Sequence, residues 1–382
     1  MQTEPIRVLQ VVGRMDRGGI ETMIMNLYRN IDRTKVQFDF LAHYGREAAY
    51  NDEIRAMGGR IYEMPALRDE KHVFFWKFFS YLHALNKFFS EHREYKIIHG
   101  HMTNTAALYL PIAKKYGVTC RIVHSHSTHS KKGLLGILTT FLHKFATRDA
   151  TDFFSCSEAA EKWFFPDEII KSGRIHVISN AIDAKRFRFD PARREVMRER
   201  LGLGDAMAIV HVARFRPEKN QAFMLDVLRE ILKVNKNVVL IYVGDGPLEE
   251  EVKARATAYG VSEQVCFLGD RADVPDILQA ADVFVLPSIW EGLPLTVIEA
   301  QASGLHCVVS DTLSQEMNVL GLVKYVSRDD LEAWVNALIE AGAASRRDTY
   351  EEMVAAGYDI DLTAQRIQEF YLLKHFELEN SK

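Results

Sequence analysis

The chain has 382 residues, of which 47% are hydrophobic and 26% charged. At roughly 150 residues per domain this length predicts two or three domains, and the composition is close to the globular average, which excludes a disordered chain and a fibrous repeat. Residues 1–200 carry 32 Lys and Arg against 23 Asp and Glu, whereas residues 201–382 carry 16 against 29. Halves of opposite charge indicate different partners.

The positive excess of the first half lies mainly in residues 101–150, which hold seven basic residues and one acid, Asp149. Such a segment suits an anionic membrane surface or an anionic acceptor. A nucleic-acid partner is not expected, because nucleic-acid-binding domains are usually strongly basic, whereas the sequence pI of this chain is about 6.4.

The four cysteines, Cys120, Cys156, Cys266 and Cys307, stand far apart and form no C-x-x-C pair. This spacing predicts neither a zinc site nor a disulfide framework, and it suits a reducing, cytoplasmic location. No stretch approaches the run of about 18 apolar residues that a membrane span needs. We therefore expect any membrane contact to be peripheral, at the inner face of the cell membrane.

Short runs rich in β-branched residues alternate with helical patterns along the chain. In the first half, strands are expected at 6–12, 38–42, 97–101, 121–124, 152–155 and 175–178. After a polar stretch the pattern restarts, with strands expected at 208–213, 238–243, 265–268, 283–286 and 307–310. Such alternation predicts parallel sheets with crossover helices. The fold class is therefore α/β, with two similar domains that meet near residues 180–205.

Three helical segments have unusual patterns. Residues 73–89 are dense in aromatic side chains, and we interpret them as a core helix. Residues 131–148 place apolar residues on one stripe with basic residues beside it, which fits core packing and an interfacial membrane helix equally well. Residues 362–377 form the pattern of an amphipathic helix, which by itself does not indicate where the helix packs.

The stretch E-G-L-P-L-T-V-I-E runs from Glu291 to Glu299, after an expected strand and a Pro-Ser turn. A helix that begins near Pro294 places Glu291 in the preceding loop and Glu299 on the second helical turn. The N–H groups of the first turn, which contains Leu295 and Thr296, then point between the two carboxylates and can hold an anion. A phosphate bound there leaves one Glu beside a sugar and the other beside a ribose.

This stretch and the A-Q-A-S-G after it resemble the motif of retaining nucleotide-sugar glycosyltransferases of the GT-B architecture, the family of sucrose synthases and bacterial mannosyl- and glucosyltransferases. The run from Glu299 to Asp311, followed by Glu316, is most similar to the branch of exopolysaccharide and capsule assembly. The resemblance covers essentially the whole chain. It implies two Rossmann-like parallel-sheet domains facing across a cleft: an acceptor domain over 1–184, a nucleotide-sugar donor domain over 185–361, and a C-terminal helix over 362–382 that packs back on the first domain.

The resemblance also implies roles for residues of the second domain. Arg214 and Lys219, in A-R-F-R-P-E-K-N after an expected strand, match the cations that stabilise the leaving diphosphate. Two cations five residues apart at the carboxyl end of a strand are also chemically suited to grip a diphosphate. Leu295 and Thr296 are expected at the same diphosphate. The donor sugar is expected at Glu291, Gly292, Leu293 and Pro294, and the ribose and base at Glu299, Gly244 and Arg271.

Two acidic positions have structural explanations beside functional ones. Asp273, two residues after Arg271, is either close to the base or the N-cap of a helix that begins at Val274. The chain's one Asp-x-Asp, Asp359 and Asp361, precedes the last helix. We interpret it as a cap rather than as the metal-binding motif of single-domain glycosyltransferases.

Gly18 and Gly19 follow the first expected strand and open a helix, where glycine lets backbone N–H groups approach a ligand. They resemble the family loop that faces the donor diphosphate, and a plain tight turn explains them equally well. The dinucleotide pattern G-x-G-x-x-G is absent, which argues against hydride transfer.

Histidines stand at two strand ends of the first half, in I-H-G-H and V-H-S-H. Two histidines separated by one residue can point to the same side of a strand and suggest a metal site. No Cys or carboxylate stands nearby to complete a ligand set, so no metal site is predicted. The resemblance implies that His124 lies against the donor sugar, with His126 as the alternate. His101, His126 and Asn180 are acceptor-side candidates, although Ala181 after Asn180 replaces the family's usual Gly.

Taken together, the resemblance implies a retaining, metal-independent hexosyltransferase whose catalytic residues are His124, Glu291, Arg214 and Lys219. It would move a sugar from a nucleotide-diphosphate sugar, with a UDP-sugar favoured and no cofactor, to a lipid-linked or oligosaccharide hydroxyl in exopolysaccharide or capsule assembly. The alternatives are a nucleotide-sugar epimerase of the same fold and a non-catalytic sugar-nucleotide-binding subunit. Loss of the Glu pair or of the Arg/Lys pair would favour the subunit, and all four residues are present.

Overall fold

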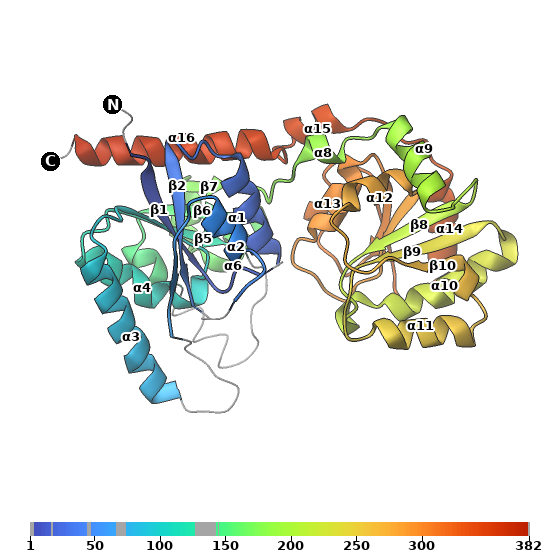
Figure 1. The fold of residues 1–382 in the computed structure, drawn as a ribbon, viewed down its shortest axis with the longest axis horizontal. Helices are drawn as coiled ribbons and strands as arrows, with labels where there is room; N and C mark the ends of the chain where they lie inside the picture. Colours follow the sequence, from blue (N-terminus) through green and yellow to red (C-terminus); the bar gives the residue numbers. More distant parts are fainter. Residues whose placement is uncertain are drawn as a thin grey trace. The chain divides into compact units, whose positions relative to one another are not determined.

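The structure is a computed structural model that describes residues 4–16, 18–43, 47–65, 74–126, 143 and 145–380. The chain divides into two compact units. Unit 1 comprises Met1–Ala181 and Ile360–Lys382, and unit 2 comprises Ile182–Asp359. Each unit contains one parallel β-sheet covered by helices (Figure 1). The expected α/β class, with two Rossmann-like domains, is confirmed.

The sheet of unit 1 has seven parallel strands in the order β3-β2-β1-β4-β5-β6-β7. They are β1 (Ile6–Val12), β2 (Val36–Ala42), β3 (Ile61–Glu63), β4 (Ile97–Gly100), β5 (Cys120–Ser125), β6 (Asp152–Ser155) and β7 (Ile175–Val177). The expected strands are all present, and their ends differ from the expected ones by no more than two residues. Strand β3 was not expected, because three residues are too few to show an alternating pattern.

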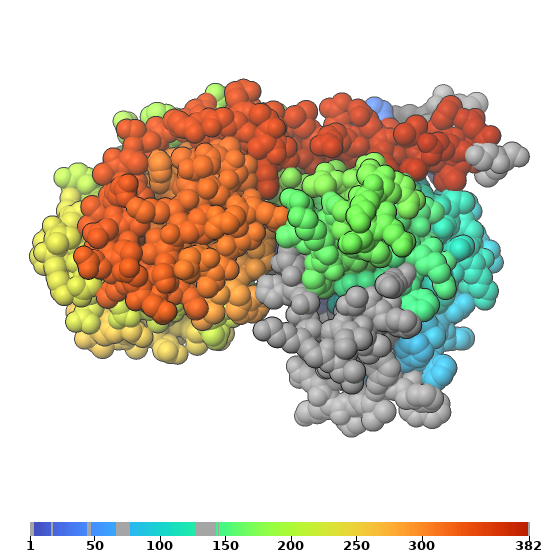
Figure 2. Space-filling model, turned by 180° about the vertical axis from the view of Figure 1, so that it is seen from behind, coloured from blue at the N-terminus to red at the C-terminus, as the bar shows by residue number. Residues whose placement is uncertain are grey.

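Helices cover both faces of this sheet. They are α1 (Gly19–Asn30), α2 (Asn51–Ala56), α3 (Phe74–Glu91), α4 (Thr103–Lys115), α6 (Glu158–Phe164), α7 (Asp167–Lys171) and α16 (Ile360–Glu379). Helix α16 is the C-terminal helix of the chain, and it packs on α1, β1, β2 and β4 of unit 1. Its buried side chains include Ile360, Ala364, Ile367 and Tyr371. Figure 2 shows this helix in red along the surface of the unit.

Helix α3 contains the aromatic segment, and the core-helix interpretation is confirmed for the part from Tyr81 onward. Tyr81, Leu85, Phe88 and Phe89 are buried against the sheet. Phe79, nearer the start of the helix, is 52% exposed. The segment 131–148 lies outside the described residues except for 143 and 145–148, so neither of its two interpretations is tested.

The sheet of unit 2 has six parallel strands in the order β10-β9-β8-β11-β12-β13. They are β8 (Met207–Val212), β9 (Val238–Val243), β10 (Val265–Phe267), β11 (Val283–Leu286), β12 (His306–Ser310) and β13 (Val323–Val326). The helices are α8 (Ala184–Phe187), α9 (Pro191–Arg200), α10 (Gln221–Val234), α11 (Glu249–Ala258), α12 (Val274–Ala280), α13 (Leu295–Ala302), α14 (Leu331–Gly342) and α15 (Tyr350–Ala355). Short 3-10 turns lie at Pro217–Lys219, Ser262–Gln264 and Gln315–Met317. Strand β13 was not expected.

Both sheets contain one point where the strand order reverses. It lies between β1 and β4 in unit 1 and between β8 and β11 in unit 2. The loops that leave two such strands diverge to opposite faces, so a crevice opens at the carboxyl ends of the strands, where open α/β sheets bind ligands. The loops after β1, β4, β8 and β11 are therefore the places in which to look for function.

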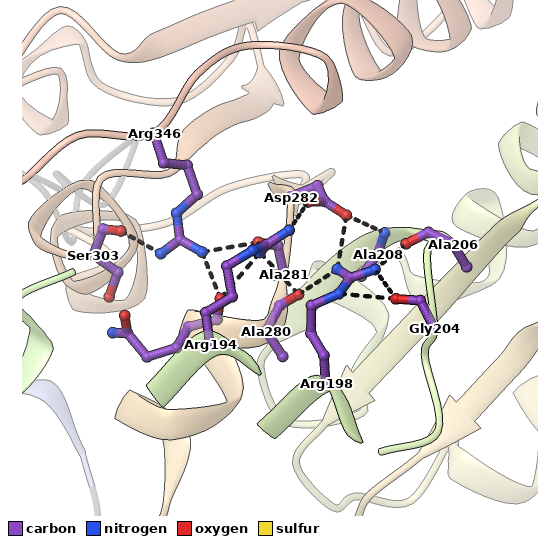
Figure 3. A network of polar contacts seen from close by, with 11 residues as sticks. Arg194, Arg198, Gly204, Ala206, Ala208, Ala280, Ala281, Asp282, Ser303 and Arg346 are labelled. Atoms are coloured by element: carbon purple, nitrogen blue, oxygen red, sulfur yellow. Dashed lines mark hydrogen bonds and ion pairs between the residues drawn. The ribbon is translucent and has the colours of Figure 1, made fainter. Parts of the chain in front are cut away.

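The opposite, amino edge of the sheet in unit 2 is held by three arginines (Figure 3). Asp282, just before β11, accepts a hydrogen bond of 2.7 Å from the Ala208 N–H and forms ion pairs with Arg194 and Arg198. These two arginines and Arg346 also donate to carbonyls at and just after the end of α12, those of Gln279, Ala280 and Ala281. Helix-terminal carbonyls lack partners in their own helix, so the guanidinium groups satisfy them and anchor α9 to the sheet.

We predict that Asp282→Asn lowers the free energy of unfolding by about 2–3 kcal/mol, because it leaves Arg194 and Arg198 without their countercharge in a mostly buried setting. The matched control is Asp348→Asn, which breaks a more exposed ion pair with Arg188 and should cost less than about 1 kcal/mol. Urea unfolding followed by circular dichroism measures both. Equal losses in the two variants would contradict the role assigned to Asp282.

Candidate functional site

The loop after β8 carries the two predicted cations of unit 2. The Arg214 side chain is 59% exposed, and its Nε lies 3.5 Å from Asp245 Oδ1 in the loop after β9. Gln221 donates from Nε2 to the Arg214 carbonyl at 2.9 Å, which holds the backbone beneath the guanidinium group. The Lys219 side chain is only 21% exposed and ends a 3-10 turn. One cation therefore extends into solvent while the other is enclosed by protein.

Glu291 lies in the loop after β11 and forms an ion pair with Lys219. Its side chain is 11% exposed, and the buried Ser288 hydroxyl donates to the same Oε1 atom at 2.7 Å. The two loops are also joined through their backbones, because the Ile289 N–H donates to the Glu218 carbonyl at 2.8 Å. The fold thus places the predicted sugar-binding carboxylate on the predicted diphosphate-binding ammonium group and holds both in position.

Helix α13 follows this loop, begins at Leu295 and has Pro294 at its N-cap. Pro294 has no side-chain group that could cap the helix, so the first-turn N–H groups of Leu295 and Thr296 point out of the helix end and are suited to an anion. Gly292 is exposed and Leu293 is partly buried beside them. The sequence-based arrangement of loop, helix start and second turn is therefore present in the structure.

Glu299 lies on the second turn of α13, as the spacing predicts. Burial raises the pKa of its carboxyl group to about 7, and the Arg186 cation opposes this effect. The protonated and ionised forms therefore coexist near neutral pH.

The Glu299 pKa leads to a pH-dependent stability. Its native pKa of about 7 lies above the ordinary value of 4.5, so the native state holds a proton that the unfolded chain releases between these two values. The stabilising contribution is complete below pH 4.5 and is lost as the pH rises through 7. Glu299→Gln stays neutral at every pH, so its free energy of unfolding should rise by about 2–3 kcal/mol relative to that of the natural protein when the pH is raised from about 5 to about 8. Urea unfolding at both pH values measures the difference, and a pH-independent difference would refute the assignment.

The loops after β8, β9 and β10 meet at Gly244. Its φ is +130°, and a Cβ there would lie 2.3 Å from the Ala213 carbonyl oxygen. The Gly244 N–H donates to the Gly269 carbonyl at 2.8 Å. Glycine is therefore required by both conformation and space at this predicted nucleotide-binding turn.

Arg271 lies in the loop after β10 and donates two hydrogen bonds to Asp273, at 2.5 and 2.7 Å. Asp273 occupies the N-cap position of α12, but its side chain does not cap the helix. Asp273 therefore stands at the helix start, as the cap explanation predicts. Its carboxylate, however, accepts hydrogen bonds from Arg271 and not from the N–H groups of the helix.

In unit 1, Gly18 is the N-cap of α1 and Gly19 is the first helical residue. Neither has a positive φ, and a Cβ at Gly19 would meet open space. The N-terminus of α1 is thus placed after β1, at the point where the strand order reverses. Asn180 lies after β7, is 6% exposed, and its Oδ1 has no hydrogen-bond partner among the residues that the structure describes.

The three predicted histidines come together with a fourth, His99. His99 and His101 lie on and just after β4, and His124 and His126 on and just after β5, so their side chains share one face of the sheet. His99 Nε2 lies 3.0 Å from His124 Nδ1, and His101 Nδ1 lies 2.9 Å from His126 Nε2. The carboxyl ends of these two strands therefore carry a histidine cluster, defined as His99, His101, His124 and His126.

Two residues outside the cluster contact its histidines. The Tyr371 hydroxyl of α16 lies 2.5 Å from His99 Nδ1, and Gln10 Oε1 of β1 lies 2.9 Å from His101 Nε2. Burial lowers the pKa of each histidine of the cluster, to about 3 for His99. All four imidazoles are therefore neutral at pH 7.

Several residues of these sites were not predicted from the sequence. Ser288 stands in the Pro-Ser turn and could have been found from its place beside Glu291. His211 of β8 is fully buried, and its two ring nitrogens have no hydrogen-bond partner among the described residues. Burial and the Lys219 cation lower its pKa to about 3. Tyr371 stands 272 positions from His99, so no local pattern could have linked the two.

Most of each unit matches the model of a known protein family. Residues 17–186 match the family described as Glycosyltransferase Family 4, and residues 193–356 match the family described as Glycosyl transferases group 1. The EpsF glycosyltransferase of Bacillus subtilis (strain 168) is 33% identical over 370 residues, which are 94% of each chain. The capsular polysaccharide biosynthesis glycosyltransferase CapH of Staphylococcus aureus is 23% identical over 97% of this chain and 99% of its own.

Two further proteins are similar to the chain. The Escherichia coli UDP-Gal:alpha-D-GlcNAc-diphosphoundecaprenol alpha-1,3-galactosyltransferase is 29% identical over 64% of this chain and 66% of its own. Among solved structures, Anabaena Alr3699/HepE in complex with UDP and glucose superposes with a TM-score of 0.72 at 19% identity, over 96% of this chain and 99% of that one. This structural likeness establishes a shared fold.

Proposed function

Because this chain belongs to the glycosyl transferases group 1 family and is a GT-B glycosyltransferase related to enzymes of polysaccharide biosynthesis, we propose that it transfers a hexose from a UDP-sugar to a lipid-linked or oligosaccharide acceptor. The proposed reaction retains the configuration of the transferred carbon and needs neither a metal nor a cofactor. The observation that carries the proposal is the ion pair of Lys219 with Glu291 beside the start of α13.

The proposed donor site uses the groups at the carboxyl edge of unit 2. Arg214 offers a bidentate fork and Lys219 a point charge to the diphosphate, and the N–H groups of Leu295 and Thr296 add the positive end of a helix dipole. These groups supply the positive charge that a metal would otherwise bring to a diphosphate. We propose that the ribose binds Glu299 and that the base lies toward Gly244 and Arg271.

The proposed chemistry places negative charge on the leaving diphosphate. The bond from the sugar C1 to the phosphate oxygen breaks, an oxocarbenium-like state forms, and the acceptor hydroxyl attacks from the same face while a leaving-phosphate oxygen takes its proton. Arg214 and Lys219 stabilise the charge that develops. The contacts of Lys219 and Ser288 with Glu291 both go to Oε1. We assign Oε2 to the sugar hydroxyls, together with Gly292, Leu293 and Pro294.

For unit 1 we propose the roles that the family resemblance implies. Gly18 and Gly19 bind the donor diphosphate, and His124 contacts the donor sugar. The acceptor side of the site comprises His101, His126 and Asn180. The relatives reported above do not favour an epimerase or a non-catalytic subunit.

The donor proposal predicts the effect of single substitutions on transfer. Arg214→Ala and Lys219→Ala should each lower kcat/KM at least about 100-fold, because each removes a cation from the developing charge. The matched control is Arg216→Ala, which alters a half-exposed cation of the same loop and should change kcat/KM less than about threefold. The assay uses UDP-, GDP- and ADP-sugars with a lipid-linked oligosaccharide, with and without EDTA.

Each outcome of this assay bears on one part of the proposal. Full turnover in both alanine variants would overturn the diphosphate site, and loss of turnover in EDTA would overturn metal independence. Preference for a GDP- or ADP-sugar would overturn the UDP assignment. Release of an altered sugar without acceptor would identify an epimerase, and donor binding without turnover would identify a binding subunit.

We also propose that unit 1 contacts an anionic membrane, which would bring it to a lipid-linked acceptor. The basic excess of residues 101–150 and the exposed Phe79 on α3 support this contact. The acceptor in the name of the Escherichia coli relative is a diphosphoundecaprenol-linked sugar. In the part of the chain that the structure describes, no helix is both long and apolar enough to cross a bilayer.

Sedimentation with anionic vesicles tests the membrane proposal. We expect binding at low salt that weakens as salt screens the charges, and little binding to neutral vesicles. Phe79→Ser should lower the bound fraction, whereas the control Val234→Ser, at an exposed apolar residue of unit 2, should not. Absence of binding to anionic vesicles at low salt would contradict the proposal.

A further inference from the structure

The histidine cluster has more ligand capacity than the proposed transfer uses. One ring nitrogen from each of His99, His101 and His124 lies within 4.8 Å of the other two, and all three side chains are buried. We propose that these three histidines bind a divalent transition-metal ion of the zinc class, with His126 bordering the fourth position.

The spacing of the nitrogens fits such an ion. At a Zn–N distance of about 2.1 Å, two ligand nitrogens of a tetrahedral site lie about 3.4 Å apart. His99 Nε2 and His124 Nδ1 are 3.0 Å apart, and His101 Nδ1 lies 2.9 Å from His126 Nε2. The His99–His124 pair is thus already close to this spacing, and the His101 nitrogen, which lies within 4.8 Å of both, would complete the set by side-chain rotation.

The outer contacts of the cluster match those of metal-bound histidines, whose second ring nitrogen is normally hydrogen-bonded. Gln10 Oε1 can only accept a hydrogen bond, so the His101 Nε2 that it contacts is the protonated ring nitrogen, which leaves a lone pair on Nδ1. The Tyr371 hydroxyl oxygen can accept a hydrogen bond from His99 Nδ1–H, and in this tautomer the lone pair of His99 lies on Nε2, where it can bind the ion. In these tautomers both His99 and His101 keep a ring nitrogen whose lone pair can bind an ion.

The cluster also leaves polar atoms unsatisfied. His124 Nε2 and His126 Nδ1 are buried and have no hydrogen-bond partner among the residues that the structure describes. Buried imidazole nitrogens without protein partners are normally satisfied by a bound water, ion or ligand, and an ion can satisfy both of these atoms.

This inference departs from the sequence-based expectation of no metal, which rested on the lack of a nearby Cys or carboxylate. Three imidazoles form a zinc ligand set by themselves. The ion takes no part in the proposed transfer, whose diphosphate is held by Arg214 and Lys219 of unit 2. Because His124 is also proposed to serve the donor sugar, an ion bound there would compete with substrate and inhibit.

The experiment is a titration of the full chain with Co²⁺, whose visible absorption is intense when three or four ligands surround it tetrahedrally. We expect saturable absorption with one Co²⁺ per chain, and Zn²⁺ but not Mg²⁺ should displace it. His101→Gln should abolish the absorption, and His306→Gln, at a partly exposed histidine of unit 2, should leave it unchanged. Circular dichroism verifies that each variant is folded.

A second variant keeps the inference testable if His101→Gln fails to fold. Tyr371→Phe removes only the hydroxyl that contacts His99 and should weaken Co²⁺ binding about 10- to 100-fold. Absence of saturable absorption in the natural chain, or absorption that survives His101→Gln, would overturn the inference. Neither result depends on glycosyl transfer, so failure of this proposal is distinguishable from failure of the proposed function.

Discussion

The candidate sites depend on one constraint of parallel sheets: neighbouring strands whose crossover helices lie on opposite faces send their loops apart at the carboxyl edge. In unit 2 this separation lies between β8 and β11, and the ion pair of Lys219 with Glu291 spans it. In unit 1 it lies between β1 and β4, beside the start of α1 and His101. The amino edge of unit 2, by contrast, is closed by the arginines around Asp282 and serves stability.

Burial at the carboxyl edges sets the protonation states of the candidate residues. It raises the pKa of Glu299 to about 7 and lowers the pKa of His211 to about 3, because both groups lose hydration in their charged form. The same effect keeps the histidine cluster neutral. Unit 2 therefore supplies positive charge through Arg214 and Lys219, while unit 1 supplies uncharged nitrogen ligands. The carboxyl edge of the sheet in unit 2 is therefore suited to anionic ligands, and that of unit 1 to transition-metal ions.

Much of the candidate site in unit 2 was predictable because its residues are close in sequence. Glu291 and Glu299 are linked by the geometry of one helix start, and Arg214 and Lys219 by one loop. The strands followed from runs of β-branched residues, whereas β3 and β13 escaped because one is very short and the other contains Lys324. Asp273 was correctly placed at a helix start, but no local rule indicated that its carboxylate would bind Arg271.

By itself the sequence determined the α/β class, the order of the main strands, the helix that separates Glu291 from Glu299 and the family resemblance, because each of these depends on residues a few positions apart. Only the tertiary structure decided that Lys219 meets Glu291 and that His99, His101, His124 and His126 form one cluster with Gln10 and Tyr371. Those contacts join strands and loops far apart in the chain. Their partners are set by strand order and register, which local propensity does not encode.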